Sequence, residues 1–274
     1  WVTRADFAAA RDDVMASMDQ PTIDGVNTYF VSRAATAAGL KVALSGVGGD
    51  ELLGGYPSFA QVPTLARRVG ALPGAAVWGR GLRTLGAPLL SRLTSPKAAG
   101  LFEYGGTYGG SYLLRRGLFM PWEIPGIVGR DLARAGWDAL QTSGRLATSV
   151  AGLDSPVLRV TALESTWYMR HQLLRDTDWA SMAHSIEIRT PLVDHTLLQQ
   201  VAPLRARHHG AVTKRAMARV PRPGLPDAIL DRPKTGFTIP VREWLLADTP
   251  DAAERGYRGW ARWVYRHHLD AVAA

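Results

Sequence analysis

The chain has 274 residues, of which 46% are apolar and 20% are charged. This composition is typical of a globular protein and excludes a disordered one, because a chain that cannot collapse is far less apolar. The absence of cysteine excludes disulfides, thiolate metal sites and cysteine nucleophiles. Since no apolar run of about 20 residues and no secretory signal is recognisable, we expect a cytoplasmic protein without membrane contact.

The formal net charge is +8, from 32 Lys and Arg against 24 Asp and Glu. The basic residues are scattered and form no block of five or more, so the pattern favours a solvated basic surface. We therefore expect no nucleic-acid partner. A non-enzymatic basic binding module is the alternative that this charge leaves open.

The first elements follow from apolar spacing. Residues 4–18 have the periodicity of an amphipathic helix, and a second helix is predicted over residues 26–38, with Asp24 as its N-cap and Gly39 at its end. The short apolar run Leu40–Leu44 predicts a buried parallel strand. This order of elements indicates the second half of a βαβ unit.

Beyond residue 56 the patterns predict helices and no further convincing strand. The predicted helices cover residues 58–69, 128–146, 157–176, 197–201, 211–220 and 252–269. Gly- and Pro-rich connectors are predicted at residues 72–96 and 102–110, and the aromatic side chains of the last helix are expected to dock onto the body. The expected fold is α/β, predominantly helical with few parallel strands: residues 1–60 form the edge of a nucleotide-binding sheet and residues 61–274 a mostly helical body.

The predicted strand runs into a glycine-rich turn, LSGVGGDELLGGY, over residues 44–56. Ligands of open α/β sheets bind beyond the carboxyl ends of the strands, and glycines let backbone N–H groups approach a phosphate closely. Asp50 and Glu51 would repel bare phosphate, so carboxylates at this place indicate an intervening Mg²⁺ ion. An ordinary tight turn with Asp50 as a helix cap is the alternative.

Two later segments also contain charged side chains that are candidates for a functional site. Residues 176–195, DTDWASMAHSIEIRTPLVDH, place five charged side chains and two histidines in an otherwise apolar stretch. Residues 231–240, DRPKTGFTIP, hold Lys234 in a loop between two prolines, and the chain has only four lysines. The three segments together are far stronger evidence for a function than any one of them alone.

In this order, the three segments resemble the synthetase domain of glutamine-dependent asparagine synthetases and their relatives. The family pattern is approximately SGxGxDELFGGY, DRASMAHSxExRxPFLDH and RPKxGFxxPxxxW, and the resemblance extends over nearly the whole chain. A helix that begins at Lys214, before the last motif, is a weaker family feature. The resemblance implies the C-terminal portion of an adenine nucleotide alpha-hydrolase-like (PP-loop) ATP pyrophosphatase fold.

The resemblance also implies a reaction. Aspartate attacks the α-phosphate of ATP, an acyl-adenylate and pyrophosphate form, and ammonia from a glutaminase domain displaces AMP to give asparagine. The implied partners are thus ATP, Mg²⁺, aspartate and ammonia, with a homodimer left open. Such chemistry depends on neutralised phosphate charge and ordered reactants more than on a protein nucleophile.

Roles carry over from the resemblance motif by motif. In the first motif, Ser45 and Gly46 contact the nucleotide, Asp50 binds Mg²⁺ and pyrophosphate, and the predicted cofactor-binding set is completed by Val47, Gly48, Gly49 and Glu51. In the last motif, Lys234 stabilises the charge that builds up on the leaving pyrophosphate.

The middle motif has two readings. The resemblance places Glu187 and Arg189 near the acyl-adenylate, where Glu187 could orient the substrate amine or the nucleophile. The equal alternative is a buried Glu187–Arg189 ion pair that only fixes the loop before Pro191.

The sequence also departs from the family pattern. Val47 stands where asparagine synthetases often carry an acidic residue and β-lactam-forming relatives a tyrosine, and an isopropyl group cannot transfer a proton. The PP-loop and the glutaminase cysteine are absent from these 274 residues. We therefore expect a fragment that is inactive alone, with amidation of another carboxylate or formation of an intramolecular amide (β-lactam or lasso-peptide type) as alternatives.

Overall fold

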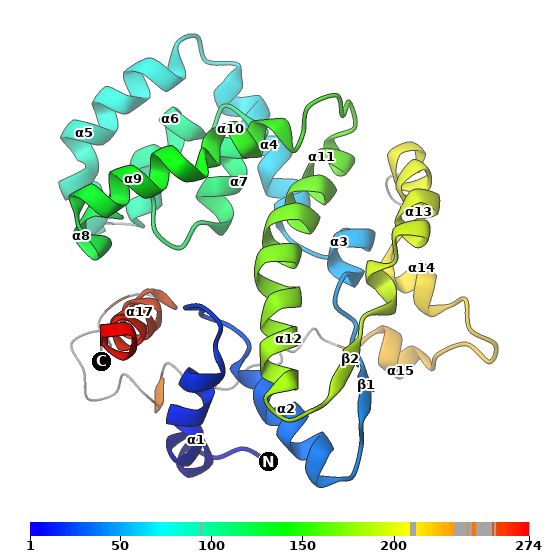
Figure 1. Cartoon of the computed structure of the whole chain (residues 1–274). Helices are drawn as coiled ribbons and strands as arrows, with labels where there is room; N and C mark the ends of the chain where they lie inside the picture. The colour runs from blue at the N-terminus through cyan, green and yellow to red at the C-terminus, as the bar shows by residue number, and fades with distance from the viewer. Residues whose placement is uncertain are drawn as a thin grey trace. The chain divides into compact units, whose positions relative to one another are not determined.

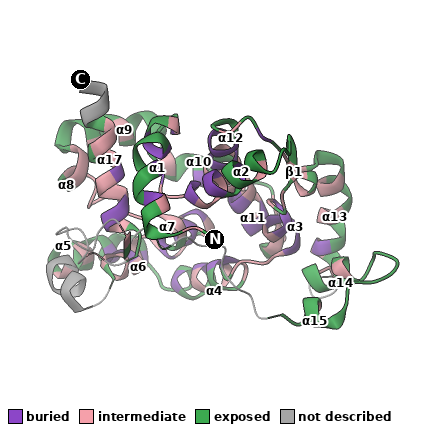
Figure 2. Ribbon diagram, turned by 90° about the horizontal axis from the view of Figure 1, so that it is seen from below, coloured by how far each residue is buried: buried purple, intermediate pink, exposed green. Residues whose placement is uncertain are grey.

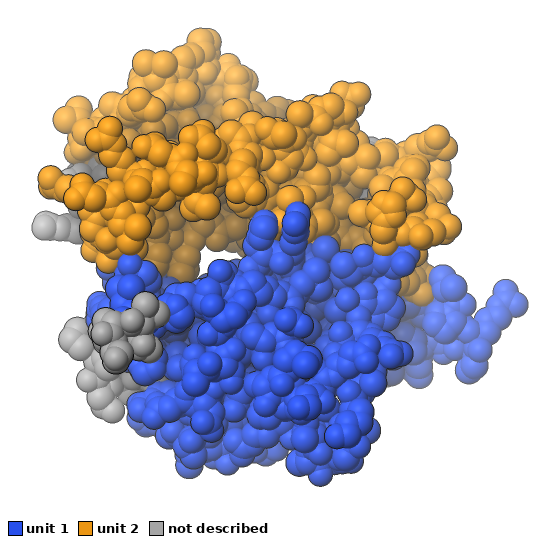
Figure 3. Space-filling view, viewed as in Figure 1, with its two compact units in different colours: residues 1–48, 169–194, 218–274 blue, residues 49–168, 195–217 orange. Residues whose placement is uncertain are grey.

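A computed structural model describes residues 1–93, 95–208, 212–232, 240, 243–244, 254 and 256–273. The described residues are mostly helical, with two short parallel strands, as expected for the α/β class with few strands (Figure 1). They divide into two compact units (Figure 3). Unit 1 comprises residues 1–48, 169–194 and 218–274, and unit 2 comprises residues 49–168 and 195–217. The predicted division at residue 60 stays a prediction.

Unit 1 contains the two strands and the helices around them. Its elements are α1 (Arg4–Ser17), α2 (Val26–Ala37), β1 (Val42–Leu44), α12 (Leu174–Met182), β2 (Glu187–Arg189), a 3₁₀ turn (Pro191–Val193), α15 (Asp227–Leu230) and α17 (Arg258–Ala273). The helices predicted at residues 4–18 and 26–38 are confirmed within one residue. The predicted cap of the second is wrong: Gly25, with φ of 88°, is the N-cap of α2, and the Asp24 carboxylate only accepts the N–H of Gly25.

The core of unit 1 joins its first and last helices. Phe7 and Val14 of α1, Tyr29 of α2 and Trp179 of α12 are buried in one cluster with Trp260 of α17. Figure 2 shows buried residues on these helices next to exposed or half-buried ones. The prediction that aromatic residues of the last helix dock onto the body is therefore confirmed for Trp260.

The two strands pair in parallel, with Ala43 opposite Ile188. The predicted parallel strand is confirmed as β1, and its partner β2 was not predicted. The expectation that the strand is buried is wrong, because Val42 and Leu44 are 40% and 76% exposed. Alternate side chains of a strand project from opposite faces, and the face that carries Val42 and Leu44 has no covering layer among the described residues.

Unit 2 is helical. Its elements are α3 (Gly49–Leu53), α4 (Ser58–Gly70), α5 (Ala75–Leu93), a 3₁₀ turn (Pro96–Gly100), α6 (Leu101–Tyr104), α7 (Tyr108–Arg116), α8 (Pro125–Val128), α9 (Arg130–Leu140), α10 (Thr142–Thr148), α11 (Pro156–Leu163), α13 (His195–Arg207) and α14 (Lys214–Ala218, whose last residue is counted in unit 1). Val62, Tyr112, Leu146, Val160 and Leu163 form its apolar core.

Several predicted elements of the second half differ in the structure. The two predicted connectors contain helices, because α5 packs against α6 and the 3₁₀ turn, and α7 packs against α4. The helix predicted at 128–146 is broken at Gly129 and Gln141, both with positive φ. The helix predicted at 157–176 continues to residue 182 but has a π-helical middle, Glu164–Leu173.

A buried ion pair connects α4 and α7 of unit 2 with the residue that follows α11. Glu164 is fully buried and pairs with Arg116, 2.9 Å from guanidinium nitrogen to carboxylate oxygen. The hydroxyls of Ser58 and Tyr112 donate to the same carboxylate. Each oxygen of Glu164 therefore has partners, which offsets the cost of burying its charge.

Within the described ranges, no helix is both long enough and apolar enough to cross a lipid bilayer.

The exposed strand face gives a stability prediction. Leu44→Ser is expected to change the free energy of unfolding by less than about 0.5 kcal/mol, because a surface side chain loses no packing. Ile186→Ala, at the residue directly before β2, is expected to cost about 2–5 kcal/mol, because Ile186 is fully buried. Urea denaturation of both variants checks this, and a Leu44→Ser cost as large as that of Ile186→Ala would contradict an exposed β1 face.

Candidate functional site

The glycine-rich turn begins as an extension of the β1–β2 pairing. The N–H of Ser45 donates to the carbonyl of Arg189 at 2.8 Å, one residue beyond the end of β1. The N–H of Val47 then donates to the Ser45 hydroxyl oxygen at 3.3 Å. The hydroxyl thus closes the turn locally, and the turn lies where open α/β sheets place their ligands.

Two glycines of the turn have different surroundings. Gly48 has a φ of +91°, and a Cβ there would lie 2.8 Å from Val193 and 2.9 Å from the Leu192 carbonyl oxygen, so this position requires glycine. Gly46 has no atom within 4 Å of an added Cβ. One end of the turn is therefore sealed against its own unit, and Gly46 presents open backbone.

The open side of the turn faces a cavity of about 380 Å³. Ser45, Gly46 and Val47 form one wall, and Ala43 and Ile188 contribute the inner face of the strands. The remaining wall comes from α2, α12 and the segments before them, including Asn27, Thr28, Asp24 and Asp176. A cavity of this size at the carboxyl ends of parallel strands is the candidate ligand site of unit 1.

Two carboxyl groups line this cavity, and burial raises the pKa of both. The pKa of Asp176 rises from 3.8 to about 6, mainly through burial, against the lowering effect of hydrogen bonds from the Trp179 indole and the Thr22 hydroxyl. Burial also raises the pKa of Asp24. The indole of Trp179 holds Asp176 in place, and it also lies so close to Gly25 that a side chain there would overlap it. Asp24 and Asp176 thus belong to the site, although the sequence analysis assigned neither of them to it.

In unit 2, Asp50 lies in the first turn of α3 and forms an ion pair with Lys214. The Lys214 ammonium, at the start of α14, is 2.6 Å from Asp50 Oδ1. Gly55 makes room for this pair, because a Cβ there would overlap the Asp50 carboxylate. The structure thus brings a predicted Mg²⁺ carboxylate together with the lysine that the family pattern places before the last motif.

Glu51 is oriented differently from Asp50. Its side chain is 1% exposed and accepts a hydrogen bond from the Tyr56 hydroxyl at 2.9 Å, while Oε2 has no hydrogen-bond partner among the described residues. Burial raises the pKa of Glu51. Its carboxyl group therefore lies in the interior of unit 2, which does not support the predicted side-chain contact with a cofactor.

A buried arginine holds the end of α3. The Arg205 guanidinium donates to the carbonyl oxygens of Leu52 at 2.9 Å and Glu51 at 3.3 Å. These carbonyls carry the partial negative charge of a helix C-terminus, which a cation stabilises. Arg205 also lies over the Phe59 ring, and it fixes the short helix that carries Asp50. The role of Arg205 could not be predicted from the sequence, because nothing local relates residue 205 to residue 51.

Glu187 and Arg189 form an ion pair at 2.9 Å, with the two side chains 60% and 61% exposed. The pair that was one of the two interpretations is present, but it is on the surface and not buried. The hydrogen bond from Arg189 lowers the pKa of Glu187. Exposed pairs contribute little to stability, so this geometry leaves both side chains available to a ligand.

Lys234, the predicted lysine of the last motif, lies outside the described residues. Among the residues that are described, no group of three or more histidines and carboxylates is arranged to hold a metal ion. A Mg²⁺ ion bound by one carboxylate and by the phosphates of a nucleotide needs no such group. Asp50 as the Mg²⁺ ligand therefore stays a prediction.

The geometry of the turn predicts that alanine in place of its glycines has different effects on stability at the two positions. Gly48→Ala is expected to destabilise the chain by about 1–3 kcal/mol, because the new Cβ meets Val193 and Leu192 at a positive φ. Gly46→Ala is expected to leave stability within about 1 kcal/mol of the parent chain, since its position is open. Thermal and urea unfolding of the two variants measure this, and equal costs would contradict the described turn.

The raised pKa of Asp176 predicts a pH dependence of stability. The folded state keeps the proton up to about pH 6, whereas the unfolded chain loses it near pH 3.8, so the free energy of unfolding falls as pH rises through this window. Asp176→Asn should remove this pH-dependent loss of unfolding free energy, which is on the order of 3 kcal/mol.

Urea unfolding at a series of pH values checks this, with Asp131→Asn on exposed α9 as the control. A wild-type chain whose stability rises with pH relative to the Asp176→Asn variant would contradict the assignment.

Comparison with known proteins agrees with the motifs. The profile of the asparagine synthase family matches residues 1–271. A provisionally named glutamine-hydrolyzing asparagine synthetase of Mycobacterium tuberculosis (strain H37Rv) is 30% identical over 250 residues, which cover 90% of this chain and 37% of that protein. Asparagine synthetase (glutamine-hydrolyzing) 1 of Bacillus subtilis (strain 168) is 26% identical over 246 residues, 83% of this chain and 35% of that protein. No solved structure matches.

The chain thus spans little more than a third of the length of these relatives. The match to the family nevertheless runs through all three motifs and almost from end to end. The chain belongs to the asparagine synthase family.

Proposed function

We propose that this chain is the C-terminal portion of the synthetase domain of an ATP-dependent amide-forming ligase. The reaction would convert aspartate, ATP and ammonia from glutamine to asparagine, AMP and pyrophosphate. The observation that carries the proposal is the cavity of about 380 Å³ in which the Ser45–Val47 turn meets the carboxyl ends of β1 and β2. Family membership supplies the reaction class, and this cavity supplies a place for a ligand.

The nucleotide would bind at the open backbone of the turn. Gly46 leaves room for an anion to reach backbone N–H groups, and Gly48 holds the turn in the required shape. The Ser45 hydroxyl accepts from the N–H of Val47, so its own proton is free to be donated to a phosphate or ribose oxygen. The chain's contribution at this point is to bind and orient the reacting phosphate.

Asp50 would hold Mg²⁺, which neutralises phosphate charge when bound. Lys214 would hold the Asp50 carboxylate in place before the metal arrives, and its ammonium could then pair with a polyphosphate oxygen. Lys234 would supply further positive charge to the leaving pyrophosphate. Glu51 would serve the interior of unit 2 through Tyr56 and not the nucleotide.

The site supports a second candidate substrate. The two ionisable side chains among the cavity residues are the carboxyl groups of Asp24 and Asp176, and the described lining offers no cation for the α-carboxylate of aspartate. Val47 likewise lacks the acidic group found in many family members. A relative that amidates another carboxylate, on a substrate with amine or hydroxyl groups, is favoured by these two observations. The exposed pair Glu187–Arg189 is a further candidate contact for that substrate.

The proposal is tested by nucleotide-induced stabilisation of this chain. Mg²⁺ and ATP together are expected to raise its melting temperature, because a ligand that binds only the folded state stabilises it. Gly46→Ala and Asp50→Asn should each reduce the shift, since one fills the approach to the turn and the other removes the metal ligand.

The control variants are Gly81→Ala on α5 and Asp13→Asn on α1, both exposed and outside the site. They should respond to Mg²⁺ and ATP like the parent chain. Equal shifts in all variants, or stabilisation by DNA in a salt-dependent manner in place of ATP, would contradict the proposal and favour the basic binding module.

A further inference from the structure

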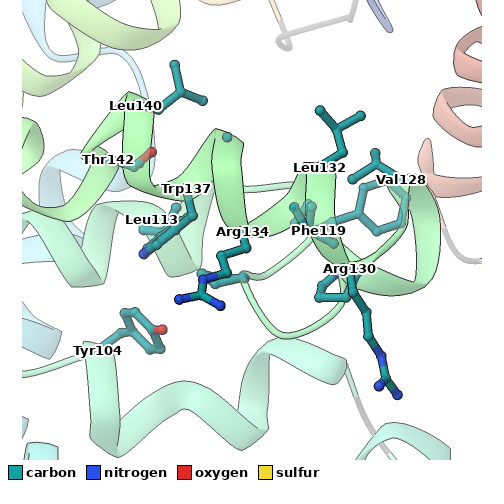
Figure 4. Close-up of a pocket in the computed structure, with 15 residues that line it drawn as sticks. Tyr104, Leu113, Phe119, Val128, Arg130, Leu132, Arg134, Trp137, Leu140 and Thr142 are labelled. Carbon is teal, nitrogen blue, oxygen red and sulfur yellow. The ribbon is translucent and has the colours of Figure 1, made fainter.

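Unit 2 contains an apolar cavity that the ligase reaction does not use. It lies between α9 and the segment from α6 to α8, and it has a volume of about 580 Å³ (Figure 4). Leu113, Phe119, Leu132 and Trp137 are among the side chains that line it. Its volume is in the range of small-molecule sites, roughly 300–1,000 Å³, and its lining is mainly apolar as in such sites.

Two arginines of α9 give this cavity its charge. Arg130 and Arg134 are one helical turn apart and both line the cavity, whose lining contains no Asp or Glu. Neither forms a hydrogen bond, an ion pair or a ring contact with any residue that the structure describes. Both side chains are exposed, and Figure 4 shows Arg134 extending toward Tyr104 and Arg130 extending in another direction, away from Arg134. The cavity thus combines an apolar interior with two uncompensated positive charges.

A neighbouring cavity differs from this one because the arginine in its lining has an acidic partner. It has a volume of about 650 Å³ and shares Tyr104, Leu113 and Trp137 with the first. Its lining also contains an arginine, Arg80, but it includes the carboxylate of Glu103 as well, which lies 3.3 Å from Arg80 and also pairs with Arg83. The charge of Arg130 and Arg134 is therefore not a general property of this helical region.

We propose that the cavity under α9 binds a small amphiphilic anion: an aliphatic or aromatic body that ends in a carboxylate or phosphate group. The body would be buried against Leu113, Phe119 and Trp137, which removes apolar surface from water. The anionic group would be attracted by the positive charge of Arg130 and Arg134, and a planar guanidinium group matches carboxylate and phosphate oxygens. The occupant is a dissolved small molecule, because the apolar surface is concave and takes up a volume of molecular size.

The proposal is tested with decanoate as the probe, by isothermal titration of the full chain. Decanoate should bind to one saturable site, and decylammonium, which has the same chain and the opposite charge, should bind at least tenfold more weakly. The double variant Arg130→Gln/Arg134→Gln should weaken decanoate binding at least tenfold. Arg68→Gln, which removes an exposed arginine of α4 with no described partner, should leave it unchanged.

A second variant fills the cavity without harming the fold. Gly136 lines the cavity and has no atom within 4 Å of an added Cβ, so Gly136→Leu places a side chain in the cavity and improves the helix propensity of α9. It should abolish decanoate binding while the melting temperature is maintained or raised. Gly81→Leu, in an equally open position on α5, is the control and should bind decanoate normally.

Three outcomes would overturn the proposal. They are the absence of saturable decanoate binding, equal binding of decanoate and decylammonium, and full decanoate affinity in the Gly136→Leu variant. Binding to phosphatidylglycerol vesicles without binding of monomeric decanoate would also overturn it, and would identify the surface as a membrane contact. None of these outcomes bears on Mg²⁺ and ATP binding at the Ser45–Val47 turn, so the two proposals fail independently.

Discussion

The pairing of β1 with β2 is the constraint on which the candidate site depends. These strands are separated by more than 140 residues of sequence, and their ladder continues into the turn through the hydrogen bond from Ser45 to Arg189. That bond fixes where the glycine-rich turn begins, and contact of Gly48 with Leu192 and Val193 fixes its far end. Both anchors come from the segment around β2. The middle motif thus supports the first motif, whatever further role Glu187 and Arg189 have in binding substrate.

Charge is distributed unevenly over the first motif and its surroundings. Asp50 is paired with a lysine at the surface, Glu51 is buried with a tyrosine hydroxyl, and Asp24 and Asp176 are partly or fully withdrawn from water. Burial raises the pKa of Glu51, Asp24 and Asp176, and Asp50 is the one of the four that forms an ion pair with a lysine. Asp50 is the carboxylate that we propose for the metal, because it lies at the surface beside Lys214. Glu51 shows that adjacency in sequence does not give adjacent carboxylates the same function.

Sequence reasoning identified the elements that local patterns determine. The apolar spacing of α1 and α2 and the short run of β1 are visible in single segments, and the three motifs are visible together. Elements whose structure depends on contact with a distant segment of the chain could not be predicted in this way. Residues 187–189 are too few to show strand periodicity, and they are a strand because they pair with β1. Residues 72–96 contain Gly and Pro, yet α5 forms there because it packs against α6.

The same limit applies to the candidate site. The turn at Ser45–Gly49 could be predicted from its glycines, and the role proposed for Asp50 rests on the carboxylates of the same short stretch. Asp176, Lys214 and Arg205 contribute through contacts with residues more than 100 positions away. No pattern within their own segments indicates such contacts. The motif can therefore be recognised in a single sequence, whereas the side chains that hold it in place can be recognised only in the three-dimensional structure.

The uncovered face of β1 has a practical consequence for work on this chain. Leu40, Val42 and Leu44 form a strip of branched apolar side chains on a short strand, and strips of this kind promote self-association in concentrated solution. Purified material should therefore lose solubility as it is concentrated, even while every helix remains folded. Light scattering would then report on this strip long before circular dichroism reports any change, and a charged residue at position 42 would be the simplest remedy for crystallisation trials.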